Sequence, residues 1–207
     1  MGDLWSAISQ IPAGELSEAE KEGILYMREE EKLARDVHLK LCEIWGLQIF
    51  RNIADSEQTH MDAVKLLISR YNLEDPAPSE VGKFSNPTLQ ELYYQLVELG
   101  SKSLEDALKV GAMIEEIDIV DLKKHINEPD NQDIILVYEN LMKGSRNHLR
   151  AFVSQLKSRG IEYVPQYISP EEYQAIISTP IETGNAGSGP GQGASWGGGK
   201  GHGKGGS

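Results

Sequence analysis

Apolar residues recur three and four positions apart along most of residues 17–180, which is the pattern of amphipathic helices. Nowhere does an alternation of apolar and polar residues run long enough to predict a β-strand. Capping residues and breaks at glycine or proline divide the pattern into separate helices. These are predicted over residues 17–46, 47–71, 87–99, 103–126, 130–160 and 169–180.

Four of the predicted helices are long, and their connections indicate how they pack. The break at Gly46 is short, so the first two should form a tight antiparallel hairpin. Residues 72–86 are rich in proline and small polar side chains, which predicts an irregular connection. We therefore expect an all-α fold: a four-helix bundle with one long crossover connection, an extra helix in the crossover and a short C-terminal helix.

The two ends of the chain differ in composition from this body. Residues 1–16 are interpreted as an N-terminal extension, residues 17–180 as the helical domain and residues 181–207 as a glycine-rich tail. The tail holds 12 of the 21 glycines and almost no apolar side chains. Since nothing in it offsets the entropy lost on ordering, it is predicted to be flexible.

Each long helix places polar or ionisable residues in the middle of its apolar stripe. In chain order they are Glu30, Glu57, His60, Glu115, Asp118, Ser145 and His148. Glu57 and His60 form a Glu-x-x-His pair, whose side chains project from the same face of a helix. Glu116 has Lys109 and Lys123 seven residues away on either side, so we assign it to the solvent-facing side.

Several inward carboxylates and imidazoles would repel one another unless a cation lay among them. No lysine or arginine falls on these inward stripes, and a pair of metal ions would supply the charge. Carboxylate and imidazole ligands suit iron, manganese or zinc.

Each signal also has an ordinary explanation. A lone Glu-x-x-His is common by chance, and His148 alone could be a hydrogen-bonded core residue. The run of residues 29–31 offers three registers for the inward glutamate. The coincidence across four helices favours the metal centre.

The pattern resembles the ferritin-like di-metal carboxylate superfamily, in which two helices supply a Glu and two supply a Glu-x-x-His. The segments MREEEKLARDVH and ENLMKGSRNHLRAF are also similar to an uncharacterised ferritin-like family (DUF2202). The resemblance implies a ferritin-like bundle with two bound metal ions, iron first and manganese or zinc as alternatives. It implies metal ligands at the following positions: Glu30, Glu57, His60, Glu115 and His148.

One position departs from the superfamily pattern. The carboxylate of the fourth helix is replaced by Ser145, whose neutral hydroxyl is a weaker ligand. Asp118, one turn after Glu115, could restore the missing charge, and we expect it to be a ligand. Tyr26 and Tyr138 lie one and two turns from Glu30 and Ser145, and these two tyrosines and Ser145 are expected to support the ligands. Two satisfied core tyrosines are an equally good explanation.

Charge and cysteine content limit the function. The formal net charge of −12 argues against nucleic-acid binding, and no apolar run is long enough to span a membrane. A single cysteine, Cys42, excludes an internal disulfide and a paired-cysteine redox site. The N-terminus as given carries no secretory signal, which predicts a cytoplasmic protein; a signal peptide already removed would leave the same sequence.

Three functions are to be separated, and the resemblance implies the first of them. A di-iron centre would react with peroxide or oxygen, as in the erythrins, and would need an external electron donor because paired cysteines are missing. The second function is metal storage or binding without turnover, and the third is a metal-free helical scaffold. We expect metal ions as partners and, as an assembly, a homodimer at most, because the crossover and tail would crowd a ferritin cage.

Overall fold

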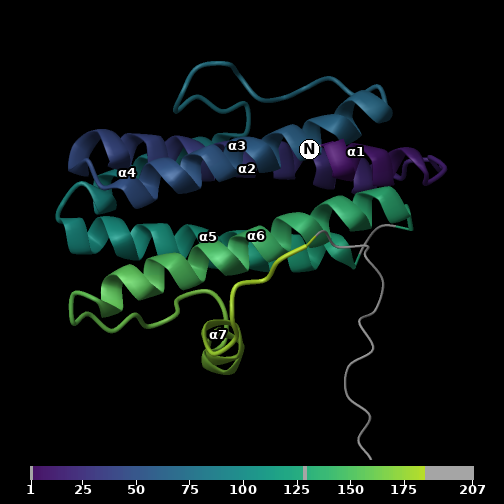
Figure 1. The fold of residues 1–207 in the computed structure, drawn as a ribbon. Coiled ribbons are helices and arrows are strands. Elements are labelled where there is room, and N and C mark those ends of the chain that lie inside the picture. The colour runs from purple at the N-terminus through teal and green to yellow at the C-terminus, as the bar shows by residue number, and fades with distance from the viewer. Residues whose placement is uncertain (1, 128–129, 185–207) are drawn as a thin grey trace, which may run out of the picture.

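The structure is a computed structural model that describes residues 2–127 and 130–184 (Figure 1). Seven helices and no strands occur among these residues. The helices are α1 (Gly2–Ser9), α2 (Glu18–Trp45), α3 (Gln48–Arg70), α4 (Pro87–Gly100), α5 (Leu104–Ile126), α6 (Gln132–Lys157) and α7 (Pro170–Ile177). The all-α prediction is confirmed. The predicted flexible tail lies, from residue 185 onward, outside the described residues.

The helix ends follow the capping signals. The Ser17 hydroxyl accepts from the backbone N–H of Glu20, and the Glu20 side chain accepts from the backbone of Ser17, which is a complete capping box. At the other end of α2, Gly46 has φ of 64°, a left-handed conformation that glycine adopts without strain. Asn86 and Ser103 cap α4 and α5 with side chains that accept from backbone N–H groups of the first turn.

The four long helices pack as two hairpins, α2 with α3 and α5 with α6 (Figure 1). α2 also contacts α5, and α3 contacts α6, so the four helices surround one core. The chain passes from the first hairpin to the second through residues 71–103, which include α4. α7 packs on α6, as does the short helix α1, which the sequence pattern did not predict.

A buried lysine fastens the crossover to α2. Lys32 is 1% exposed, and its ammonium group donates to Asp36 at 2.5 Å and to the backbone carbonyls of Glu80 and Lys83 at 2.7 and 3.0 Å. The same group lies 4.5 Å from the centre of the Phe84 ring. The charge is therefore fully coordinated although it is buried.

Two neighbours on α2 hold the same connection. Buried Arg28 donates to Asp75, and Glu29 accepts from the backbone N–H groups of Ser85 and Asn86. The buried basic residues of α2 thus bind the crossover, which leaves the inward carboxylates described below without a lysine or arginine partner.

The prediction that Glu116 faces solvent is wrong. Glu116 is fully buried and accepts hydrogen bonds from the Tyr163 hydroxyl and from the backbone N–H groups of Gln166, Tyr167 and Ile168. The segment between α6 and α7 folds back over α5 and covers this carboxylate. The flanking lysines could not reveal that covering segment, because it is distant in sequence.

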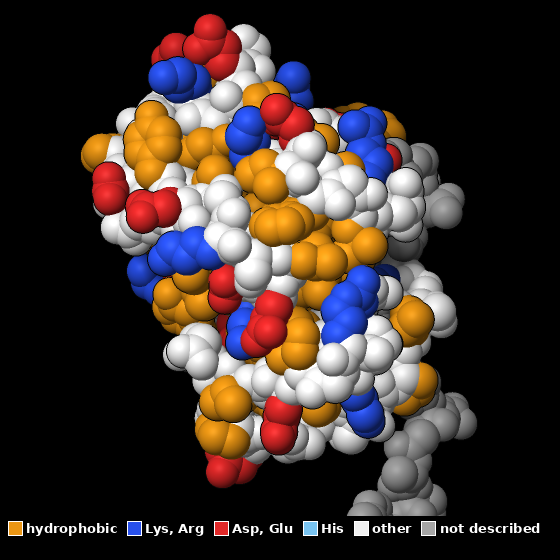
Figure 2. Space-filling view, turned by 90° about the vertical axis from the view of Figure 1, so that its left-hand side faces the viewer, with side chains coloured by type: hydrophobic (Ala, Val, Ile, Leu, Met, Phe, Trp, Pro, Cys, Tyr) orange, Lys and Arg blue, Asp and Glu red, His pale blue; other side chains and the backbone are white. Residues whose placement is uncertain are grey.

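The surface is mixed in character. Figure 2 shows apolar side chains gathered in the middle of one face, with basic and acidic side chains around them. None of the described helices combines the length and the apolar character needed to cross a membrane.

Candidate metal centre

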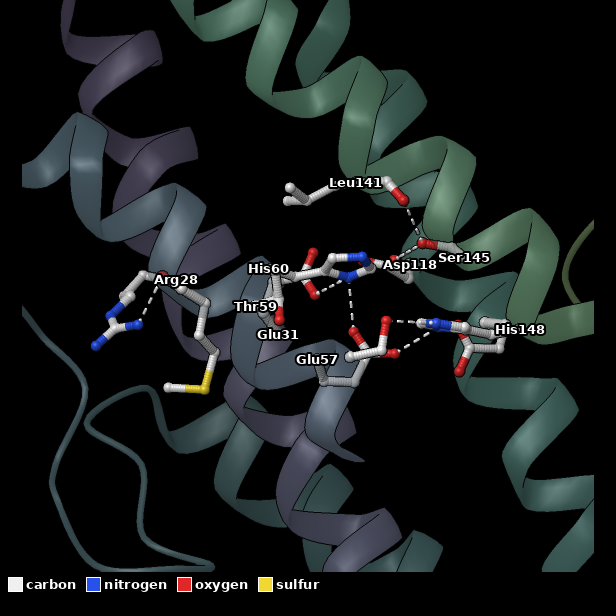
Figure 3. Close-up of polar contacts among 12 residues, drawn as sticks. Arg28, Glu31, Glu57, Thr59, His60, Asp118, Leu141, Ser145 and His148 are labelled. Atoms are coloured by element: carbon white, nitrogen blue, oxygen red, sulfur yellow. Dashed lines mark hydrogen bonds and ion pairs between the residues drawn. The ribbon is translucent and has the colours of Figure 1, made fainter. Parts of the chain in front are cut away.

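Carboxylates and imidazoles from all four long helices meet in the interior between the two hairpins (Figure 3). Each helix contributes two of these polar residues, and each residue is at most 9% exposed. They are Glu31 and His38 of α2, Glu57 and His60 of α3, Glu115 and Asp118 of α5, and Ser145 and His148 of α6.

Glu57 lies at the middle of this cluster. One carboxylate oxygen, Oε2, is 2.7 Å from Nδ1 of His60, and the other, Oε1, is 2.7 Å from Nδ1 of His148. Burial raises the pKa of Glu57, but the two imidazoles outweigh this effect and hold it well below its usual range. Glu57 is thus a carboxylate with one imidazole on each side.

Glu31, Glu57 and His60 form one group that could hold a metal ion. One potential ligand atom from each lies within 4.8 Å of the others. Nδ1 of His60 is 3.1 Å from Oε2 of Glu31. The other side of the His60 ring packs directly against Gly144 of α6, where a side chain would collide with the imidazole. The His60 ring can occupy this position because residue 144 is a glycine.

His38, Glu57 and Glu115 form a second such group, again within 4.8 Å. Nε2 of His38 is 3.3 Å from Oε1 of Glu115. The other oxygen of Glu115 is 3.3 Å from Nδ1 of His148, whose Nε2 is 2.9 Å from the Ser56 hydroxyl. The contact with Ser56 turns Nδ1 of His148 toward the carboxylates. Glu57 belongs to both groups.

Asp118 lies directly against Ser145. The Ser145 hydroxyl donates to Oδ2 of Asp118 and is 3.1 Å from the backbone carbonyl of Leu141. No described residue donates to Oδ1 of Asp118. The carboxylate of α5 thus occupies space next to the serine that stands where the superfamily pattern has a glutamate.

Glu30 is buried like Glu31 but belongs to neither of the two ligand groups. Burial, together with the charges of Asp118 and Asp121, raises its pKa well above the usual range. Tyr26 donates from its hydroxyl to Asp121 at 2.9 Å, so this tyrosine contacts a neighbour of Glu30. The ring centre of buried Tyr138 is 6.5 Å from that of His125.

The charges of this interior do not balance within the protein. Five buried carboxylates accompany three buried imidazoles. The carboxylates are Glu30, Glu31, Glu57, Glu115 and Asp118, and the imidazoles are His38, His60 and His148. Even with every imidazole protonated, ionised carboxylates would remain in excess, and a buried net charge is costly.

The shifts in pKa indicate which groups of this interior hold protons. Burial raises the pKa of Glu31 to about 8, although His60 acts against it. Burial would lower the pKa of His148, but Glu57 and Glu115 raise it to about 10. Burial, then Glu31 and Glu57, raises the pKa of Asp118 well above its usual range. Protons thus occupy positions that cations could take.

The donor set fits divalent transition metals. Both oxygens of Glu30, Oε1 of Glu31, Oδ1 of Asp118 and Nδ1 of His38 are buried and have no hydrogen-bond partner among the described residues. Oxygen and imidazole nitrogen suit iron, manganese and zinc, and thiolate ligands are not needed.

The structure brings most of the predicted site together. Glu57, His60, Glu115, Asp118 and His148 gather as expected.

Two inward residues differ from the sequence analysis. Beside His60 the structure places Glu31, where the sequence analysis favoured its neighbour Glu30. His38 was missed, although it lies seven residues after Glu31, a spacing of two helical turns that would have placed it on the same face.

Comparison with known proteins gives the family. The model of the uncharacterized protein domain DUF2202 matches residues 20–180. The uncharacterized protein MJ0754 of Methanocaldococcus jannaschii is 62% identical over 178 residues, which cover 86% of this chain and 96% of that protein. The crystal structure of hypothetical protein MJ0754 matches with a TM-score of 0.82 at 62% identity, over 83% of this chain and 99% of that one. The chain therefore belongs to the DUF2202 family.

Proposed function

We propose that the protein is a ferritin-like metal-binding protein whose four long helices hold two metal ions, with iron the first candidate and manganese or zinc the alternatives. One observation carries the proposal: Glu57 is shared by two groups of potential ligands, each of which includes a histidine and a second carboxylate. A carboxylate with two oxygens facing two such groups is placed to bridge two ions.

The residues divide between the two ions. Glu31 and His60 would bind the first ion with one oxygen of Glu57. Glu115, His38 and His148 would bind the second ion with the other oxygen of Glu57. Asp118, held by Ser145, would add a carboxylate from the adjacent turn of α5. This assignment replaces Glu30 by Glu31 and adds His38 to the ligands expected from the sequence.

The reaction we propose is reduction of peroxide or oxygen. Bound ferrous ions would supply the electrons for breaking the O–O bond. The chain itself supplies a water-poor interior: the His38 ring stacks on both Phe50 and Phe152, with ring centres 6.2 and 5.2 Å away, and these two phenylalanine rings also contact each other. Electrons would come from an external donor, because the one cysteine cannot form a redox pair.

Metal binding without turnover is the second candidate. The proposed ligands are at most 9% exposed. A centre buried to this degree would retain its bound ions whether or not they react with peroxide. The two candidates share the ligand set and differ in whether peroxide changes the oxidation state of bound iron.

One preparation separates these candidates. The protein is loaded with ferrous iron without oxygen, its metal content is measured, and its absorption spectrum is recorded before and after peroxide. We expect about two ions per chain and a rapid spectral change. Two ions without a peroxide-dependent change would favour binding alone, whereas no stoichiometric metal would contradict both.

A matched pair of variants tests the role of Glu57. Glu57→Gln keeps the size of the side chain but removes the charge that both groups share, so both ions should be lost, with affinity lowered more than about 100-fold. Glu43→Gln, at a 70% exposed side chain of α2, should bind like the wild type. Circular dichroism of both variants establishes that they fold.

A further inference from the structure

A row of carboxylates on α5 runs from the proposed metal centre toward the surface. Glu115, Asp118 and Asp121 follow one another at intervals of three residues. Residues spaced in this way form a ridge that winds slowly around a helix, so the row leaves the core as it advances. Six residues of helix span about 9 Å along the axis.

The outer end of this row opens into a pocket. The pocket has a volume of about 480 Å³, and its lining includes Tyr26, Asp121, Glu22 and Lys124. The Tyr26 hydroxyl donates to Asp121 at 2.9 Å, which fixes the carboxylate at the inner wall. Asp121 is half-buried and is therefore within reach of both solvent and the interior.

Glu30 lies behind Asp121 as a buried carboxylate with no donor. It is 3% exposed, and no described residue donates to either of its oxygens. Glu30 lies one helical turn after Tyr26 on the same side of α2, and the Tyr26 hydroxyl contacts Asp121, so Glu30 faces the same stretch of α5 as Asp118 and Asp121. Oδ1 of Asp118 also has no partner among the described residues. Three carboxylates thus lie close together, and none of them forms an ion pair with a lysine or arginine among the described residues.

We propose that Glu30, Asp118 and Asp121 form an oxygen-only loading site, through which divalent cations pass from the pocket to the buried centre. The inference rests on the proposed metal centre, whose ligands are otherwise closed to solvent. A site without imidazole binds transition metals more weakly than the centre does, so an ion would be handed inward. This arrangement also assigns a role to Glu30, which lies beside the centre but belongs to neither ligand group.

The charged residues that line the pocket favour the entry of cations. Glu22 and Asp121 line the pocket together with one lysine, Lys124, which opposes them, and with His125. Glu29, also in the lining, is already bound to backbone N–H groups of Ser85 and Asn86 and contributes less attraction. Negative charge focused in a pocket raises the rate at which cations arrive.

The rate of cobalt uptake tests the proposal. Metal-free full-length protein is mixed with Co²⁺ in a stopped-flow instrument, and visible absorption follows the arrival of the ion at the centre. Asp121→Asn should load about tenfold more slowly and reach the wild-type stoichiometry. Added salt should slow the wild type more than the variant, because screening weakens the attraction that the variant has lost. Glu105→Gln, at an exposed residue of α5, is the matched control and should load normally.

Two results would overturn the loading site. If the wild type binds two ions and Asp121→Asn loads at the same rate, the loading site is wrong and the metal centre stands. If the wild type binds no Co²⁺, both proposals fail. Glu30→Gln provides a second slow-loading variant, and circular dichroism and melting of the metal-free forms establish that each variant is folded.

Discussion

At the residue scale, the centre depends on how close the helices come. His60 occupies the space beside Gly144, and an added methyl group there would lie inside the contact distance of the imidazole. The glycine is needed for that approach and not for its backbone conformation, because it lies within the regular helix α6. Overpacking a tightly packed position forces the neighbour to move.

Gly144→Ala should therefore weaken metal binding through His60. We expect a loss of about 1–3 kcal/mol in the free energy of unfolding, and a loss of metal affinity of at least tenfold. Gly100→Ala, which would press on the flexible end of Leu41, serves as the control and should keep its metal affinity. Calorimetric titration with Mn²⁺ measures both variants. Wild-type affinity in Gly144→Ala would show that His60 is not a ligand.

The inward residues could be predicted where only one register was available. Glu57 and His60 lie on a helix whose other faces are clearly polar or apolar, so their position followed from the pattern. Residues 29–31 are all buried, because the crossover covers the face of α2 that would otherwise meet solvent. Periodicity alone could not choose among them, since burial on every side removes the contrast on which it depends.

At the element scale, local capping chemistry sets the helix ends, and contacts between elements far apart in sequence decide the rest. Glu20 makes a local contact and a long-range contact. It closes the capping box of α2, and it accepts hydrogen bonds from the backbone and side chain of Asn131, the residue directly before α6. Caps were predictable because they are local. The buried position of Glu116 was not, because the segment that covers it follows 47–52 residues later.

The Glu20 carboxylate should make stability depend on acid. Burial raises its pKa, but hydrogen bonds from Ser17 and Asn131 outweigh that and lower it below the ordinary 4.5. Its contribution is therefore complete above that value and is lost as the pH falls through the lowered pKa. Glu20→Gln should cost about 1 kcal/mol at pH 7 and less at pH 3. Urea unfolding at both pH values measures this. Exposed Glu18→Gln should cost little, and an equal loss at both pH values would contradict the account.

The crossover should depend on Lys32. Lys32→Met removes the cation that Asp36 and two backbone carbonyls share, leaving buried groups unpaired. We expect a loss of about 3–5 kcal/mol, with early protease cleavage within residues 74–86. Lys40→Met, which breaks an exposed pair with Glu43, should change stability by less than about 1 kcal/mol. Similar losses in the two variants would show that Lys32 does not fasten the crossover.

At the scale of the whole molecule, the acidic residues lie in two regions. Part of the formal charge of −12 lies on the surface, where acidic residues are mixed with basic ones (Figure 2). The rest lies between the two hairpins, where five carboxylates outnumber three imidazoles. The sequence predicted the hairpins and most of the inward polar residues but not Glu31 or His38, and the sharing of Glu57 emerged only from the packing of α3 against α6. The homodimer stays a prediction, which light scattering would test.

The central claim is that Glu57 bridges two metal ions, and anomalous diffraction from crystals loaded with Mn²⁺ tests it most directly. We expect two anomalous peaks about 3.5–4 Å apart, one on each side of the Glu57 carboxylate. One peak should lie beside His60 and Glu31, and the other beside His148 and Glu115. A single peak, peaks confined to the surface, or none between the hairpins at saturating Mn²⁺ would contradict it.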